Sequence, residues 1–176
     1  MIWFTADTHF AHNNILIHCE RPFKTITEMD LTMLANINEV VEPTDTIYHL
    51  GDFAFRHTMM YREGINCKHV HLIQGNHDKK IPAKCFESVS HYKEIKTDAC
   101  RKIVLCHYAM RVWNCSHHGS WQLYGHSHGS LPDEGRKSFD VGVDCWDYRP
   151  LSLDMIAEKM ERRVISKIDH HGPETP

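Results

Sequence analysis

The chain has 176 residues, of which 24% are charged, with a formal net charge of −3 and seven cysteines. That length fits one domain over residues 1–176, with a core at 1–165 and a loose C-terminal tail at 166–176. An odd number of cysteines without a Cys-x-x-Cys pair excludes a secreted disulfide framework and a zinc knuckle. The slightly acidic charge disfavours an extended nucleic-acid groove. Without an export signal or an apolar run of about 20 residues, a cytoplasmic protein that makes no contact with a membrane is expected.

Apolar runs and helical patterns alternate through the first half of the chain. The expected strands cover residues 2–6, 46–50 and 69–74, and two expected helices cover about 13–19 and 58–66. A third helix, capped by Thr27 and ended by Pro43, carries Met29 and Met33 on the face expected to pack on a sheet. Strand, loop and helix in this order indicate βαβ units.

From residue 90 onward, the pattern changes to strands with short connections. Residues 91–97 and 101–106 predict a hairpin around a turn at 98–99, and residues 121–125 and 139–143 predict two more strands. Ser152 is a suitable N-cap for a final helix that extends to about Arg163.

Side chains that can bind a metal follow nearly every one of the apolar runs. They are Asp7, His9, Asp52, Asn76, His107, His126 and His128. Open α/β sheets bind ligands beyond the carboxyl ends of their strands, so these residues are expected to converge despite their separation in sequence. Gly51, Gly75 and Gly125 directly precede ligand positions and are expected to permit sharp turns with positive φ.

This set of ligands predicts a site for two metal ions. Asp52 stands alone at a strand end and is expected to bridge the ions. One ion would also be bound by Asp7, His9 and His128, and the other by Asn76, His107 and His126. Imidazole, carboxylate and amide ligands without a thiolate favour divalent transition metals; manganese is the first choice, and iron, zinc or nickel also suit the site.

Seven further side chains are candidates for catalysis or substrate binding. His77 is expected close to the second ion, where it would protonate the departing oxygen while Asp78 orients its ring. His12, Arg21, Arg111 and His117, together with the neighbouring His118, are candidates to bind phosphate oxygens. The alternative for each of these substrate-binding candidates is an ordinary place in a solvated loop or on the charged surface.

The ordered blocks resemble the signature of the calcineurin-like metallophosphoesterases. In sequence order they are Asp7-Thr8-His9, Gly51-Asp52, Gly75-Asn76-His77-Asp78, the lone His107, and Gly125-His126-Ser127-His128. The start of the chain and Arg21-Pro22-Phe23 look like the small, capless bacterial and phage branch of that family. The resemblance implies an α/β fold, a four-layer α/β/β/α sandwich of two mixed sheets flanked by helices, with a dinuclear centre. The main departure is Cys106 before His107, where many members carry glycine; it is expected to expose a thiol near the metals.

The function expected from these residues is metal-dependent hydrolysis of a phosphate ester, by attack of a metal-bridging hydroxide on phosphorus. The small chain leaves little for a cap over the site, which favours phosphodiesters. The alternatives are a phosphomonoesterase acting on a nucleotide or another small metabolite, and a scaffold that kept the fold without catalysis. The expected partner is a phosphoester substrate of nucleotide-like character, and the sequence specifies no oligomeric state.

Overall fold

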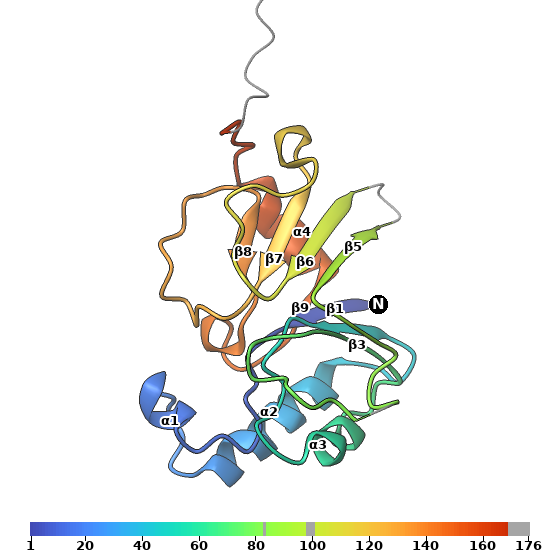
Figure 1. Cartoon of the computed structure of the whole chain (residues 1–176), viewed down its shortest axis with the longest axis vertical. Helices are drawn as coiled ribbons and strands as arrows, with labels where there is room; N and C mark the ends of the chain where they lie inside the picture. Colours follow the sequence, from blue (N-terminus) through green and yellow to red (C-terminus); the bar gives the residue numbers. More distant parts are fainter. Residues whose placement is uncertain (83, 98–100, 169–176) are drawn as a thin grey trace, which may run out of the picture.

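Two β-sheets packed face to face form the centre of the molecule in the computed structural model (Figure 1). The structure describes residues 1–82, 84–97 and 101–168. The strand order is β4-β3-β2-β1-β9 in the first sheet and β5-β6-β7-β8 in the second. The first sheet is built from the beginning of the chain, with the late strand β9 added at one edge.

The first sheet holds four parallel strands and one antiparallel edge strand. They are β1 (Ile2–Thr5), β2 (Thr46–His49), β3 (His69–Ile73), β4 (Ser88–Ser90) and β9 (Leu151–Ser152). Because β1, β2 and β3 run parallel, their carboxyl ends meet at one edge of the sheet. The sequence patterns predicted these three strands and missed the short β4 and β9.

The second sheet is also mixed. It contains β5 (Tyr92–Lys96), β6 (Lys102–Cys106), β7 (Trp121–Tyr124) and β8 (Ser138–Asp140). Strands β5 and β6 pair antiparallel, as the predicted hairpin requires, while the predicted turn at 98–99 lies outside the described residues. Strands β6, β7 and β8 are parallel, so their carboxyl ends also lie together.

Four α-helices of the described part of the chain flank the sheets. They are α1 (Ile15–His18), α2 (Ile26–Val40), α3 (Thr58–Gly64) and α4 (Leu153–Glu161). The side chain of Thr25 accepts a hydrogen bond from the Glu28 N–H group, so the N-cap of α2 lies two residues before the predicted cap at Thr27. Ser152 caps α4 as predicted. Within the described ranges, no helix is long and apolar enough to cross a lipid bilayer.

Side chains alternate between two hydrophobic clusters because successive residues of a strand point to opposite faces. On β1, Trp3 joins the cluster that contains Met29 and Met33 of α2, whereas Phe4 joins the cluster between the two sheets. Ile156 of α4 also packs into this second cluster. The α/β fold of two mixed sheets flanked by helices is therefore confirmed.

A loop covers the outer face of the second sheet. Gln122 of β7 is completely buried, and its side chain bonds to the backbone of Tyr108 and Met110. The same connection continues through a single turn of 3₁₀-helix, Ser116–His118, before β7 begins.

Candidate metal centre

The seven predicted ligand residues lie together where five strands end. One group contains Asp7, His9 and His128, the other contains Asp52, His107 and His126, and within each group the ligand atoms lie within 4.8 Å of one another. The seventh residue, Asn76, places its Oδ1 atom 3.2 Å from Nε2 of His107. Both sheets contribute to this cluster, which we call the metal centre; that it binds metal remains a prediction.

Asp52 lies between the two groups. Its Oδ2 atom is 3.5 Å from Nε2 of His9 and 3.6 Å from Nε2 of His107. Its Oδ1 atom accepts a hydrogen bond of 2.9 Å from the His77 N–H group, so one oxygen rather than two faces both imidazoles. Burial alone would raise the pKa of Asp52, but the hydrogen bonds from His107 and His77 outweigh burial and hold this pKa far below its usual range. The carboxylate of Asp52 is therefore ionised and available to bind a cation.

Among the predicted ligand residues, two buried side-chain atoms have no hydrogen-bond partner, Oδ1 of Asp7 and Nε2 of His9. Orphaned polar atoms of this kind are costly to bury unless something satisfies them. Burial raises the pKa of Asp7 to about 8 and lowers the pKa of His9 to about 2, so the ring of His9 is neutral and has a lone pair to donate. The donor set and these orphaned atoms fit a divalent cation.

Hydrogen bonds to groups outside the ligand set fix the orientation of two ligand rings. Nδ1 of His107 lies 2.7 Å from the Leu50 carbonyl oxygen, and Nδ1 of His128 lies 2.6 Å from Oδ2 of Asp144. In each ring, these contacts leave Nε2 to face the centre. Asp144 was not predicted from the sequence, because it follows the strand β8 without belonging to any recognisable motif.

Arg21 supports the centre from behind and is not free to bind substrate, which corrects the prediction. The residue is only 4% exposed, and its guanidinium forms two hydrogen bonds of 2.7 Å with Asp144. The remaining N–H groups donate to the carbonyl oxygens of Asp7 and Thr8 and to the sulfur of Met29. Since every donor of the fork is engaged, Arg21 holds the loop of Asp7 and the carboxylate of Asp144 in place.

Asp78 also binds backbone, and this differs from its predicted role. Its carboxylate accepts hydrogen bonds from the N–H groups of Asp52 (2.7 Å), Phe53 (3.0 Å) and Gly75 (2.9 Å). Both oxygens are thereby engaged, and the residue is 3% exposed. Asp78 ties the loop after β2 to the loop after β3 instead of orienting the ring of His77.

Five of the ligand residues have left-handed backbone conformations. The φ angles are 58° at Asp7, 48° at His9, 54° at Asp52, 66° at His126 and 47° at His128. L-residues with a Cβ atom adopt this region rarely and at an energetic cost, and such residues concentrate at functional sites. The left-handed turns are therefore made largely by the ligands themselves.

The glycines before the ligands serve mainly to make space. Only Gly51 has a positive φ, 98°; the expectation of positive φ was wrong for Gly75 and Gly125. A Cβ atom added to Gly75 would lie 2.2 Å from Oδ1 of Asp52, and one added to Gly125 would lie 2.5 Å from Oδ2 of Asp7. Both positions exclude larger residues because a carboxylate of the centre packs directly against the backbone.

His77 and His12 lie at the open side of the centre. The ring of His77 is exposed and packs edge-on against His9, with 5.3 Å between ring centroids, which is nearer to the first group than the sequence predicted. Nδ1 of His12 lies 3.1 Å from Nδ1 of His9. Both imidazoles are therefore placed where a molecule bound at the centre would meet them.

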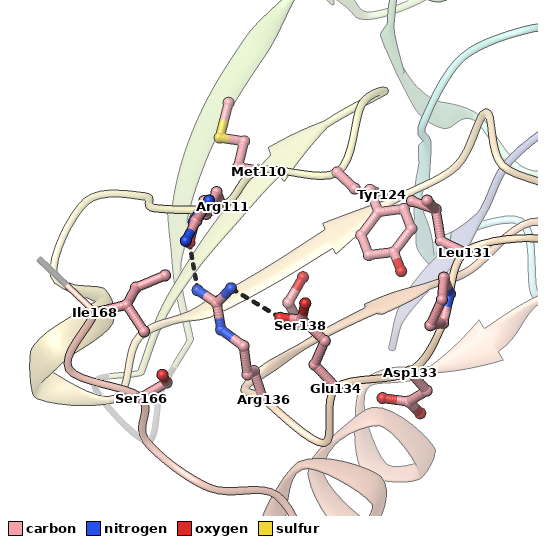
Figure 2. A pocket seen from close by; sticks show the side chains of 12 residues that line it. Met110, Arg111, Tyr124, Leu131, Asp133, Glu134, Arg136, Ser138, Ser166 and Ile168 are labelled. Carbon is pink, nitrogen blue, oxygen red and sulfur yellow. Dashed lines mark hydrogen bonds and ion pairs between the residues drawn. The ribbon is translucent and has the colours of Figure 1, made fainter.

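The structure places Arg111 and His117 away from the centre, contrary to the prediction of phosphate contacts. Arg111 lines a separate hollow of about 560 Å³ over the outer face of the second sheet (Figure 2), and none of the seven ligand residues takes part in its wall. Its carbonyl oxygen accepts a hydrogen bond from Arg136 there. His117 and its neighbour His118 precede β7, at the end of the strand opposite to His126.

One cysteine adjoins a ligand residue in the sequence, and another approaches the ligands in space. Cys106, which precedes His107, is 8% exposed, so this thiol is buried instead of open to solvent. The Sγ atom of Cys19 lies within 4.8 Å of ligand atoms of His128 and Asp144. The motif around His107 drew attention to Cys106. Cys19 belongs to no motif, because it comes from α1 and lies near the ligands only in the folded chain.

The fold and this set of side chains define a class of protein. Residues 1–139 match the model of the calcineurin-like phosphoesterase superfamily domain, and the chain belongs to that superfamily. It is 33% identical over 180 residues to an uncharacterised protein of Methanocaldococcus jannaschii, covering 96% of each chain. It is also similar to the crystal structure of a protein of unknown function from Aquifex aeolicus, with a TM-score of 0.74 and 25% identity over 90% of this chain and 98% of that one. The match over 1–139 contains all seven ligand residues and ends before Asp144.

Proposed function

We propose that this protein is a phosphoesterase that uses two divalent transition-metal ions, with manganese as the first choice and iron, zinc or nickel as alternatives. The position of Asp52 carries the proposal, because one carboxylate oxygen lies at nearly equal distances from an imidazole of each ligand group. When bound, such a pair of ions supplies a hydroxide nucleophile near neutral pH and neutralises charge on the phosphoryl group.

The chain's own residues have separate roles in this proposal. Asp7, His9 and His128 hold one ion, Asn76, His107 and His126 hold the other, and Asp52 is shared. His77 donates a proton to the departing oxygen, because its exposed ring lies directly against His9. His12 lies beside the same ring and is placed to bind a phosphate oxygen.

Phosphodiesters are the favoured substrates. His77, Asn76 and His126 are exposed, which supports a centre open enough to accept a phosphate with an organic group on each side. The competing candidate, a phosphomonoesterase acting on a nucleotide or another small metabolite, uses the same residues, so the two are separated by comparing substrates.

A metal-replacement assay tests the proposal. Protein stripped with a chelator and reloaded with manganese is expected to hold two ions per chain and to hydrolyse bis(p-nitrophenyl) phosphate faster than p-nitrophenyl phosphate. Asp52→Asn should lose nearly all turnover, whereas Asp154→Asn, an exposed change in the first turn of α4, should not. Turnover that does not follow metal content, or no turnover of any ester with both ions bound, would contradict the proposal.

The role of His77 has its own test. His77→Ala is expected to retain both ions, because its ring is not in either ligand group. Its kcat should fall far more for an ester with a poor alkoxide leaving group than for one that releases nitrophenolate, which needs no proton to depart. Equal slowing of both esters would reject the role of His77 as an acid.

A further inference from the structure

A hollow of about 320 Å³ lies beside the metal centre and is not part of it. Ala54, Phe55, Thr58, His77, Lys79 and Lys80 line most of its wall. The wall comes from the β2–α3 connection and from the segment after β3, the same two connections that carry Asp52 and Asn76. His77 belongs to this wall and also packs against His9, so the hollow opens on the side where the proposed acid stands.

The charge of this hollow is positive and uncompensated. Lys79 and Lys80 are both exposed, and among the described residues no carboxylate lies within 4 Å of either ammonium group. Among the described wall residues, Asp78 alone has a carboxylate, which is buried and bound to three backbone N–H groups. Arg56 does not line the hollow, but its guanidinium lies 6.0 Å from the ring centre of Phe55, which does.

One wall of the hollow is aromatic. The side chain of Phe55 is 48% exposed, so its ring is accessible to a molecule in the hollow. Its ring stacks on His12, with 4.5 Å between centroids and 10° between the planes, so it is held in a fixed position beside the centre. A fixed apolar surface next to free ammonium groups suits an organic molecule that carries phosphate.

We propose that this hollow binds the leaving group of the substrate, and that this leaving group is itself an organic phosphate. Phe55 contacts its apolar part, while Lys79 and Lys80 bind a phosphate other than the one that is cleaved. The volume lies at the lower end of the range of about 300–1,000 Å³ for ligand pockets, which suits one nucleotide-sized group. The inference rests on the proposed function, since it takes His77 as the residue that faces the departing oxygen.

A pair of substrates that differ in one phosphate tests the inference. Adenosine 3′,5′-bisphosphate and adenosine 3′-monophosphate lose the same 3′-phosphate, but only the first leaves a phosphorylated product. A dinucleotide with and without a terminal phosphate gives the corresponding diester pair. The manganese-loaded wild type should prefer the extra phosphate by roughly tenfold or more in kcat/KM, as expected for lost charge-assisted hydrogen bonds. The Lys79→Ala/Lys80→Ala double variant should lose that preference.

A matched control and a binding measurement separate this inference from the proposed function. Lys68→Ala removes an exposed lysine at the start of β3, at the opposite end of the strand, and should keep the preference. If the double variant keeps it too, the inference is overturned while the phosphoesterase proposal stands. If no ester is hydrolysed, the proposed function fails, and calorimetric binding of adenosine 3′,5′-bisphosphate decides the inference: the double variant must bind at least tenfold more weakly than the wild type. Equal affinity, or no binding by the wild type, overturns it.

Discussion

Asp144 stands between the guanidinium of Arg21 and the ring of His128, and touches both within 2.7 Å. Burial alone would raise its pKa, but the hydrogen bonds from His128 and Arg21 outweigh burial and hold this pKa below its usual value. The ionised carboxylate fixes the orientation of a ligand ring, and Arg21 fixes the carboxylate. This chain of contacts joins residues 123 positions apart in sequence.

Asp144→Asn should weaken one ion selectively. An amide can still accept the hydrogen bond of His128, but it lacks the charge that makes the ring a stronger ligand, and such changes cost about 10- to 100-fold in metal affinity. A calorimetric titration of the chelated protein with manganese should show one site weakened and the other nearly unchanged. Asp154→Asn is the control, and equal weakening of both sites would mean that Asp144 supports the whole fold instead of one ligand.

His49 is buried and neutral, and this makes stability depend on pH. Its Nε2 atom lies 3.0 Å from the hydroxyl oxygen of Thr8. Because this hydroxyl donates its own proton to the Phe53 carbonyl oxygen, the Nε2–H group of His49 is the donor in the contact with Thr8. Burial lowers the pKa of His49 to about 3. The unfolded chain therefore binds a proton below the ordinary value of 6.5 that the folded chain does not bind, and stability is lost as pH falls from 6.5.

Urea unfolding of the metal-free protein at pH 7.5 and pH 5 checks this effect. Between pH 7.5 and pH 5, the free energy of unfolding of the wild type should fall by up to about 2 kcal/mol more than that of His49→Gln. Each pKa unit is worth about 1.4 kcal/mol. His91→Gln, at an exposed histidine, should behave as the wild type does. A His49→Gln curve parallel to the wild-type curve would show that His49 does not contribute.

At the scale of elements, α2 joins the first sheet through a narrow stripe of side chains. Met29 and Met33 are completely buried, and Ile37 is 3% exposed, at intervals of four residues. This spacing repeats once per helical turn, so one face of α2 is covered by the sheet while the opposite face is in solvent.

Met33→Ala should lower the free energy of unfolding by about 2 to 5 kcal/mol, since it removes a buried side chain and leaves a cavity behind. Leu31→Ala changes a side chain on the same helix that is 62% exposed and should cost less than about 1 kcal/mol. Urea denaturation of both variants measures the difference. Similar losses in the two would contradict the packing of α2 described above.

Elements with a strong local signal could be predicted from the sequence. The strands β1, β2 and β3 are apolar runs, and α2 has a clear periodicity. The two-residue strand β9 could not be predicted, because pairing with β1, not its own composition, makes it a strand. The local sequence pattern predicted Thr27 as the N-cap of α2, whereas in the structure the Glu28 N–H group donates to Thr25.

The site also contains residues that could be predicted from local sequence and contacts that could not. The seven ligand residues stand in short motifs at strand ends, so their convergence follows from the parallel arrangement of the strands. The contacts of Arg21 and Asp78 depend on which backbone groups the fold leaves nearby, and no spacing in the sequence records that. Arg21 was therefore predicted to bind substrate, and Asp78 to orient His77, although the partners of both side chains are other protein atoms.

At the scale of the whole molecule, the centre joins the two sheets. Asp7, Asp52 and Asn76 follow strands of the first sheet, whereas His107 and His126 follow strands of the second. A hydrogen bond of 2.8 Å from the His126 N–H group to Oδ2 of Asp7 crosses between them. Ions bound by residues of both sheets would hold the sheets together at this end.

Manganese should therefore raise the melting temperature of the chelated protein. A ligand that binds only the folded state stabilises it by about 2.7 kcal/mol at a concentration 100 times its dissociation constant. Thermal denaturation with and without manganese measures the shift, and Asp52→Asn, which lacks the shared charge, should show a much smaller one. An unchanged melting temperature in the wild type would argue against ions shared between the sheets.

The left-handed backbone of five ligand residues also bears on when metal can act. An unfolded chain seldom visits that conformation at residues other than glycine, so a nascent chain presents the ligands in the wrong directions. Capture of ions must then follow assembly of the scaffold. Manganese is accordingly expected to lengthen the lifetime of the native state by slowing its unfolding, and to leave the rate of refolding nearly unaltered.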